Sequence, residues 1–275
     1  MPKAVIVPIE GDAPSERALA PATALAWRAH ADLILVHVAP GREQAVERDG
    51  EFKAALAGSG LSGEVVIRWR ADPARVIREV ADVSGPDAVI CMATRAPGRL
   101  GGVVLGSTAE AVTREATCPL LLVGPHVLPQ RGWPWQELAV CVDGSPASEA
   151  LLPVAAEWAD EMAMEIRLLQ VVNQATTRDL RDCYPRLHFR DDSYVRSVAV
   201  DLGSIWDTDT DAEILYGARP APTITSFLES HPTTLPFLGT HGRAGLRRVA
   251  LGSVATGVVR DSPSPVVVVG TRAGW

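Results

Sequence analysis

The sequence predicts an α/β fold built twice: two tandem domains, each a five-stranded parallel sheet flanked by helices. Three observations predict it. The 275 residues are close to two domains of about 150 residues each. The C-terminal half repeats the N-terminal half, and in both halves short apolar runs alternate with helix-like stretches. Because these runs are apolar throughout, they are typical of strands buried on both faces of a parallel sheet.

The repeat appears at two offsets. An offset of 146 aligns residues 86–124 with 232–270, and an offset of 133 aligns Glu10-Gly11 with Asp143-Gly144. The difference places extra residues in the second half, between Asn173 and Asp211. Matches at the larger offset include Thr94/Thr240, Leu105/Leu251, Gly106/Gly252, Ser107/Ser253, Arg114/Arg260 and Pro119/Pro265. We interpret the chain as a duplication.

The elements follow in order along each half. The predicted strands are 4–9, 33–38, 65–69, 88–92 and 120–123 in the first half, and 138–142, 166–172, 213–216, 235–238 and 266–269 in the second. Asp72-Pro73 and Ser145-Pro146 each place a capping side chain before a proline, which predicts helix starts. Pro236 conflicts with its strand, because proline donates no ladder hydrogen bond and is normally confined to edges or bulges. Either the strand is distorted there or its predicted bounds are off by a residue or two.

A segment rich in turn formers, 124–134, separates the halves. We therefore predict a first unit over residues 1–129 and a second unit over 136–275, with the boundary near 130–135. Trp133 and Trp135 in this linker are expected to pack against a domain.

Composition narrows the class of protein. The net charge of −7 argues against a nucleic-acid partner, which clustered Lys and Arg would bind. No apolar run approaches the roughly 18 to 20 residues of a membrane span, and the N-terminus does not resemble a secretory signal, so we expect no membrane association and a cytoplasmic location. Cys91, Cys118, Cys141 and Cys183 form no C-x-x-C pair and are expected to pack as small apolar groups.

Residues 238–253 carry the clearest functional motif. They contain G-x-x-G, nine residues and then G-S, formed by Gly239, Gly242, Gly252 and Ser253. Glycines let backbone amides approach phosphate oxygens, and a helix N-terminus offers free N–H groups and a positive dipole end. The alternative is that these glycines serve only tight turns and helix packing.

With this loop, the Asp-Gly-Ser turn after the first strand and the apolar last strand, the chain resembles a tandem universal stress protein. The resemblance implies two Rossmann-like (adenine nucleotide alpha hydrolase-like) domains and ATP as ligand, with any Mg²⁺ held through the phosphates. It also implies roles in the second unit: Asp143 contacts the nucleoside, the backbone of Val171 contacts adenine, and Gly239, Gly242, Gly252, Ser253 and Val254 form the phosphate loop.

The first unit departs from this pattern. Ala93 and Ala96 stand where the loop glycines would, and Glu10 replaces the counterpart of Asp143. An added methyl group obstructs the approach of phosphate to the backbone. We predict weak or absent nucleotide binding there, with Glu10, Val38, Gly106 and Ser107 as the counterpart residues.

Other residues leave open interpretations. Arg243, Arg247 and Arg248 could neutralise phosphate charge or form a solvated basic face. His241 and His37 are expected to be a turn residue and a packing residue. Asp207, Asp209 and Asp211 do not match a calcium loop, because Ala212 and Ala218 occupy its sixth and twelfth positions, so no metal site is expected.

We find no Walker motif, catalytic triad or paired carboxylates, so no catalytic residue is assigned and binding is favoured over catalysis. A nucleotide-independent interaction module and a weak ATPase remain alternatives. The last strands, 120–123 and 266–269, could pair at sheet edges. The resemblance implies that the two domains pair with each other through them, and a homodimer is a further expectation.

Overall fold

The computed structural model describes residues 2–94, 105–128, 132–173, 193–206, 210–240 and 251–270. The first unit contains β1 (Ala4–Pro8), α1 (Ala13–Glu16), α2 (Leu19–Ala29), β2 (Asp32–Ala39), α3 (Arg42–Ser59), β3 (Gly63–Trp69), α4 (Pro73–Ser84), β4 (Ala88–Ala93), α5 (Ser107–Glu115) and β5 (Leu120–Val123). The second contains β6 (Glu137–Cys141), α6 (Pro146–Glu149), α7 (Leu152–Met162), β7 (Glu165–Val172), α9 (Ser193–Trp206), β8 (Thr210–Tyr216), α10 (Pro220–Ser230), β9 (Thr234–Gly239), α11 (Ser253–Asp261) and β10 (Val266–Val269).

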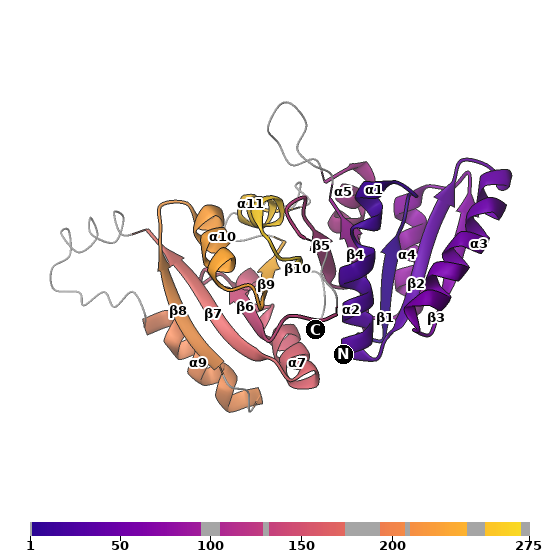
Figure 1. Ribbon diagram of the computed structural model, residues 1–275. Helices are drawn as coiled ribbons and strands as arrows, with labels where there is room; N and C mark the ends of the chain where they lie inside the picture. Colours follow the sequence, from indigo (N-terminus) through magenta and orange to yellow (C-terminus); the bar gives the residue numbers. More distant parts are fainter. Residues whose placement is uncertain are drawn as a thin grey trace, which may run out of the picture.

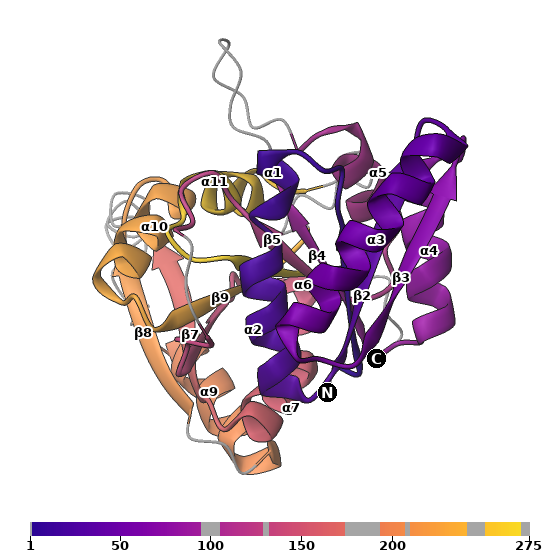
Figure 2. The ribbon, with the colours of Figure 1, turned by 45° about the vertical axis from the view of Figure 1, so that its right-hand side comes forward.

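One continuous sheet runs through both units, in the order β3-β2-β1-β4-β5-β10-β9-β6-β7-β8. Neighbours within each unit are parallel, whereas β5 and β10 pair antiparallel at the middle of the sheet. Figures 1 and 2 show the two α/β units on either side of this junction. The predicted strands are all present, and their ends differ from the predicted ones by a few residues at most.

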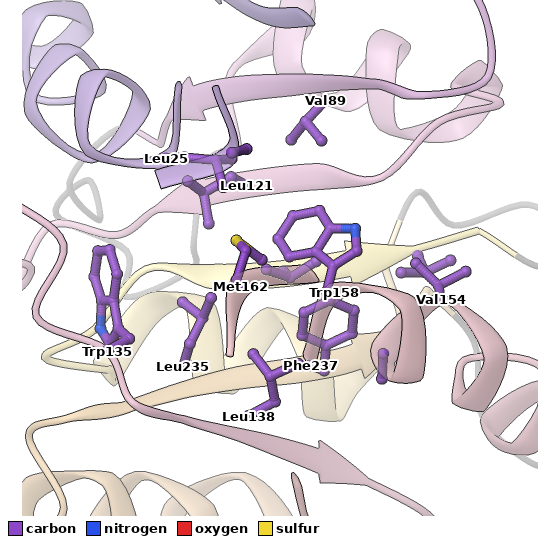
Figure 3. Packing of buried hydrophobic residues seen from close by; sticks show 14 of the residues in the cluster. Leu25, Val89, Leu121, Trp135, Leu138, Val154, Trp158, Met162, Leu235 and Phe237 are labelled. Atoms are coloured by element: carbon purple, nitrogen blue, oxygen red, sulfur yellow. The ribbon is translucent and has the colours of Figure 1, made fainter. Parts of the chain in front are cut away.

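Helices cover both faces of the sheet because strand residues are buried on both sides. Val5 and Val7 belong to the cluster under α2, α3, α7 and α9, whereas Ala4 and Ile6 belong to the cluster under α4, α5, α10 and α11. The first cluster continues across the junction: in Figure 3, Leu25 and Leu121 of the first unit face Met162 and Trp158 of the second.

Both predicted proline-led helices are present. The carboxylate of Asp72 accepts a hydrogen bond from the Arg75 amide, and the Ser145 hydroxyl accepts one from the Ser148 amide. Pro236 lies in an interior strand, since β9 lies between β10 and β6 and is one residue longer at each end than the predicted 235–238. The β9–β10 register begins one residue later, at Phe237 opposite Val267, so Pro236 precedes this ladder.

The linker packs against the second unit. The Trp135 side chain is buried, and its Nε1 donates a hydrogen bond of 2.8 Å to the Ser264 hydroxyl before β10. The Trp133 ring meets it edge-on, with centroids 4.6 Å apart. The expectation for both tryptophans is confirmed.

Candidate functional site

The two units build the same turn after their first strands. The amide of Asp143 donates to the Ser148 hydroxyl over 3.2 Å, and the amide of Glu10 donates to the Ser15 hydroxyl over 3.1 Å. The glycine between strand and helix is left-handed in both, with φ 79° at Gly144 and 85° at Gly11. The duplication seen in the sequence is therefore preserved in the hydrogen bonds of the turn.

The carboxylate of Asp143 is held in place by its own turn. Its Oδ1 accepts hydrogen bonds from the Ser145 amide at 3.0 Å and the Ser145 hydroxyl at 2.6 Å. In the first unit, Asp12 occupies the position of Ser145 and caps α1 through a 3.0 Å bond from the Ser15 amide. The first-unit turn thus carries two carboxylates, Glu10 and Asp12, where the second carries Asp143 alone.

The predicted residues of the second unit come from three neighbouring strands. Gly239 ends β9, Asp143 follows β6, and Val171 lies near the end of β7. The carboxyl ends of these parallel strands share one edge of the sheet, where α/β proteins bind ligands. Val171 is half-buried and pairs in register with Leu215 of β8.

Helix α11 begins at the same edge. Gly252 precedes its first residue, Ser253, and the Gly252 amide donates to the Thr240 carbonyl over 2.6 Å. The Thr240 amide in turn donates to the Val269 carbonyl over 3.0 Å. Because the N-cap residue, Gly252, is a glycine, it offers no side chain to the first-turn amides. Val254, in its first turn, packs against the core.

The rest of the loop lies outside the described residues. This applies to Gly242 and His241, and to Arg243, Arg247 and Arg248. Asp207, Asp209 and Cys183 also lie outside them. Among the described residues, no group of three His, Cys, Asp or Glu side chains could hold a metal ion.

The first unit contains a cavity of about 330 Å³ at the corresponding edge. All four first-unit counterpart residues, Glu10, Val38, Gly106 and Ser107, line it. Sequence reasoning missed other lining residues, including Asp12, Ser15, Pro40, Pro73 and Thr108. Pro73 could have been predicted from the sequence, because the predicted helix start at Asp72-Pro73 follows a strand and so lies at the carboxyl edge of the sheet.

His37 also lines this cavity. Its side chain is buried, with Nδ1 2.7 Å from the Ile9 carbonyl oxygen and the ring edge-on to Phe52. The expectation of a packing histidine is confirmed.

The start of α5 differs from that of α11. Gly106 has φ 84°, in the left-handed region, whereas Gly252 has φ −64°. The Thr94 carbonyl, the counterpart of the Thr240 carbonyl, accepts a 2.5 Å hydrogen bond from Arg17 Nη2. Arg17 Nη1 also donates to the Gly124 carbonyl over 3.0 Å. At the offset of 133, Arg17 aligns with Ala150, so the second unit has no counterpart of this guanidinium.

Sequence reasoning also missed Tyr194 of α9. Its hydroxyl donates to Glu149 Oε1 over 2.8 Å, beside the Asp143-Gly144 turn. Burial, followed by the hydrogen bond to Glu149, raises the pKa of Tyr194. The Tyr194 hydroxyl is the donor in this contact. The one indication in the sequence was that α9 lies within the extra residues of the second unit, which have no counterpart in the first.

The described cysteines are fully or partly buried. Cys91 and Cys118 are buried and Cys141 is half-buried, and burial raises the pKa of each thiol. They pack as the sequence predicts. None of the described helices is long and apolar enough to cross a bilayer.

The architecture defines the class of protein, which has two tandem Rossmann-like α/β units. In each unit an acidic residue, Glu10 or Asp143, begins the turn after the first strand, and a helix that follows a glycine starts at the carboxyl edge of the sheet. The chain belongs to the Universal stress protein family, whose profile matches residues 1–124 and 134–270.

Similar proteins support this. Universal stress protein Rv1996 of Mycobacterium tuberculosis is 25 % identical over 226 residues, covering 78 % of this chain and 69 % of that protein. A universal stress protein of Mycolicibacterium smegmatis is 26 % identical over 232 residues, covering 83 % of this chain and 76 % of that protein. The crystal structure of a universal stress protein from Archaeoglobus fulgidus DSM 4304 has a TM-score of 0.73 at 19 % identity, covering 98 % of this chain and 99 % of that chain, which shows the fold.

Proposed function

We propose that the chain is an ATP-binding protein that acts in the cytoplasm as a nucleotide-dependent stress-response or regulatory binder, with the nucleotide held mainly in the second unit. One observation carries the proposal: β9 ends at Gly239 and α11 starts with Gly252 and Ser253 at the same edge of the sheet, whereas β4 of the first unit ends at Ala93. Amides at such a helix start donate to phosphate oxygens, and the helix dipole favours their charge.

The neighbouring turn supports a nucleoside beside those phosphates. Ser145 orients the Asp143 carboxylate through two hydrogen bonds, so it would accept ribose hydroxyls without first reorganising. Val171 lies near the end of the adjacent strand, where family resemblance gives its backbone the contact to adenine. Any Mg²⁺ would be bound through the phosphates.

The experiment is a thermal melt with and without ATP, on the wild type, Gly252→Val and Gly50→Val. ATP at about 100 times its Kd is expected to stabilise the wild type by about 2.7 kcal/mol. The valine at position 252 should remove the shift by occupying the phosphate position. Gly50, on α3 with open space around it, is the control that should keep the shift. No shift in the wild type, or an equal shift in Gly252→Val, would refute the proposal.

A nucleotide-independent interaction module is the second candidate, favoured by the β5–β10 pairing. Under this hypothesis the two units pair within one chain through β5 and β10, so a homodimer would use other surfaces. Release of nucleotide from the purified native protein separates the candidates: bound nucleotide supports the first, and none at saturating ATP supports the second. ATP hydrolysis that Asp143→Ala abolishes would instead identify a weak ATPase.

A further inference from the structure

The first unit contacts α11, the helix whose start carries the proposed phosphate contacts of the second unit. Gly124 follows β5, and its backbone lies against the last turn of α11, beside which Figures 1 and 2 show the end of β5. A Cβ atom at position 124 would lie 2.0 Å from the Val259 carbonyl oxygen and 3.8 Å from that of Arg260. The first distance is far inside van der Waals contact, so only a glycine lets β5 and α11 approach this closely.

The Val259 carbonyl can face the first unit because its own helix offers it no amide. It is one of the last four carbonyls of α11, and the residue four positions further on is Pro263, which has no N–H to donate. His126, two residues after Gly124, lies near the same helix end. The hydrogen bond from Arg260 lowers the pKa of Asp261, and the charge of His126 adds to this effect.

Gly124 is held in place from within the first unit. Arg17 Nη1 donates to its carbonyl over 3.0 Å, and Nη2 of the same guanidinium donates to the Thr94 carbonyl over 2.5 Å. Since Thr94 follows β4 and Gly124 follows β5, the guanidinium connects the ends of two adjacent strands. The end of β5 is thus fixed, and a side chain added at position 124 would displace α11.

The equivalent contact at the other end of the junction is looser. Gly270 follows β10 and corresponds to Gly124 at the offset of 146. A Cβ atom at position 270 would lie 3.6 Å from the Ala116 carbonyl oxygen, just after α5, which is an ordinary contact. Of these two equivalent glycines, Gly124 is therefore the one whose contact excludes a side chain.

A displacement at Val259 would reach the start of α11. Val259 and Ser253 are six residues apart, about 9 Å along one hydrogen-bonded helix. The helix is also packed closely against α10, since a Cβ atom at Gly257 would lie 2.6 Å from the Ala221 Cβ. Close contacts with α10 and with the first unit together determine where the amides at the start of α11 lie.

We propose that Gly124, anchored by Arg17, positions α11 for phosphate binding, so that the nucleotide affinity of the second unit depends on residues of the first. The inference rests on the proposed function for the identity of the ligand, and it deepens that function by assigning two positioning residues that act through α11. The second unit's site is then complete only when the first unit is paired with it.

The test compares Gly124→Ala with Gly270→Ala, which add one methyl group each, in calorimetric titrations of the full chain with ATP and with adenosine. Adenosine lacks the phosphates that α11 would bind. Gly124→Ala is expected to weaken ATP binding by about tenfold or more and adenosine binding by less than about twofold, because a shift of about 1 Å in a positioned group has effects of this size. Gly270→Ala should bind both ligands as the wild type does. Thermal melts establish that each variant is folded at the titration temperature.

Arg17→Ala is a second variant that adds no atom to the junction. It removes the hydrogen bond to the Gly124 carbonyl, and it should narrow the preference for ATP over adenosine by about threefold. It decides the question if Gly124→Ala does not fold.

Hydrogen exchange of the α11 amides gives a measurement that needs no ligand. Exchange across residues 254–261 should be faster in Gly124→Ala than in the wild type or Gly270→Ala, because a displaced helix opens more readily. Equal exchange in all three proteins overturns the inference.

The two proposals fail in different ways. The inference is overturned if folded Gly124→Ala keeps the wild-type ratio of ATP to adenosine affinity, or if Gly270→Ala changes that ratio as much. A wild type that binds no ATP refutes the proposed function, and the exchange of α11 then decides whether Gly124 positions the helix.

Discussion

Leu121 of β5 lies opposite Val267 of β10, at the centre of the antiparallel pairing that joins the two units. Both side chains are fully buried and belong to the cluster that contains Leu25, Trp158 and Phe237. The indole of Trp158 meets the Phe237 ring edge-on, with centroids 5.1 Å apart. Because this cluster is shared, the stability of each unit depends on the other.

We therefore predict that Leu121→Ala lowers the stability of the whole chain by about 2–5 kcal/mol, the usual effect of emptying a buried leucine site. Calorimetry should show one unfolding transition in the wild type, and this single transition should move to lower temperature in the variant. Val83→Ala is the control, because Val83 is 90 % exposed and its truncation should change stability by less than about 0.5 kcal/mol. Two separate transitions in the wild type would show that the units unfold independently.

The two helix-leading glycines should respond differently to alanine. Gly106 has φ 84°, so Gly106→Ala is expected to destabilise the protein by about 1–2 kcal/mol through backbone strain. Gly252 has φ −64°, which alanine adopts freely, so Gly252→Ala should leave stability unchanged or raise it by up to about 1 kcal/mol. Urea unfolding of both variants measures this, and equal effects would contradict the conformational difference.

The linker is fixed to the second unit by the hydrogen bond from Trp135 to Ser264. Ser264→Ala leaves the indole N–H buried without its acceptor, which should cost about 1–3 kcal/mol. Ser204→Ala removes an exposed hydroxyl that bonds only within α9, and its effect should be near zero. Denaturant unfolding compares the two, and a Ser264→Ala variant as stable as the control would argue against this anchor.

The buried thiols should make reactivity depend on folding and pH. Burial raises the pKa of Cys118 and of Cys141 to about 12, so at pH 8 only about one thiol in ten thousand is ionised at each site. Cys183→Ser leaves the three described thiols, which should react with a disulfide reagent far more slowly in the native than in the unfolded protein.

The same groups affect stability at high pH. Each thiol has a higher pKa in the folded chain than in the unfolded chain, where it is about 8.5. The resulting contribution to the free energy of unfolding is complete below pH 8.5 and is lost as the pH rises toward 12. Native stability is thus expected to fall across that interval. For the reactivity prediction, fast labelling of all three thiols in native Cys183→Ser at pH 8 would contradict the burial of Cys91, Cys118 and Cys141.

The sequence was sufficient for the strands because uninterrupted runs of Val, Ile and Leu, such as 266–269, are typical of strands that helices cover on both faces. It was not sufficient for Pro236, because local preference does not show where the ladder to a neighbouring strand begins. The buried Phe237 and its neighbours hold this segment in the interior of the sheet despite the proline.

For the site, the repeat identified Asp143, Gly252 and their counterparts, since aligned residues occupy equivalent turns. It did not reveal the contact of Arg17 with Thr94, because the two are 77 residues apart and nothing in either segment indicates the other. It likewise did not reveal that Tyr194 would reach Glu149, since α9 follows the extra residues that have no aligned counterpart. Long-range side-chain contacts of this kind depend on tertiary packing.

The linker that covalently connects the two units paired at β5 and β10 has a consequence for evolution and assembly. Two separate copies of one gene product would meet as identical halves and could exchange partners on dilution. Here the halves are always present in equal number and never separate, so a substitution such as Glu10 for aspartate changes only one of them. The chain can thus diversify one half while the other retains its original chemistry.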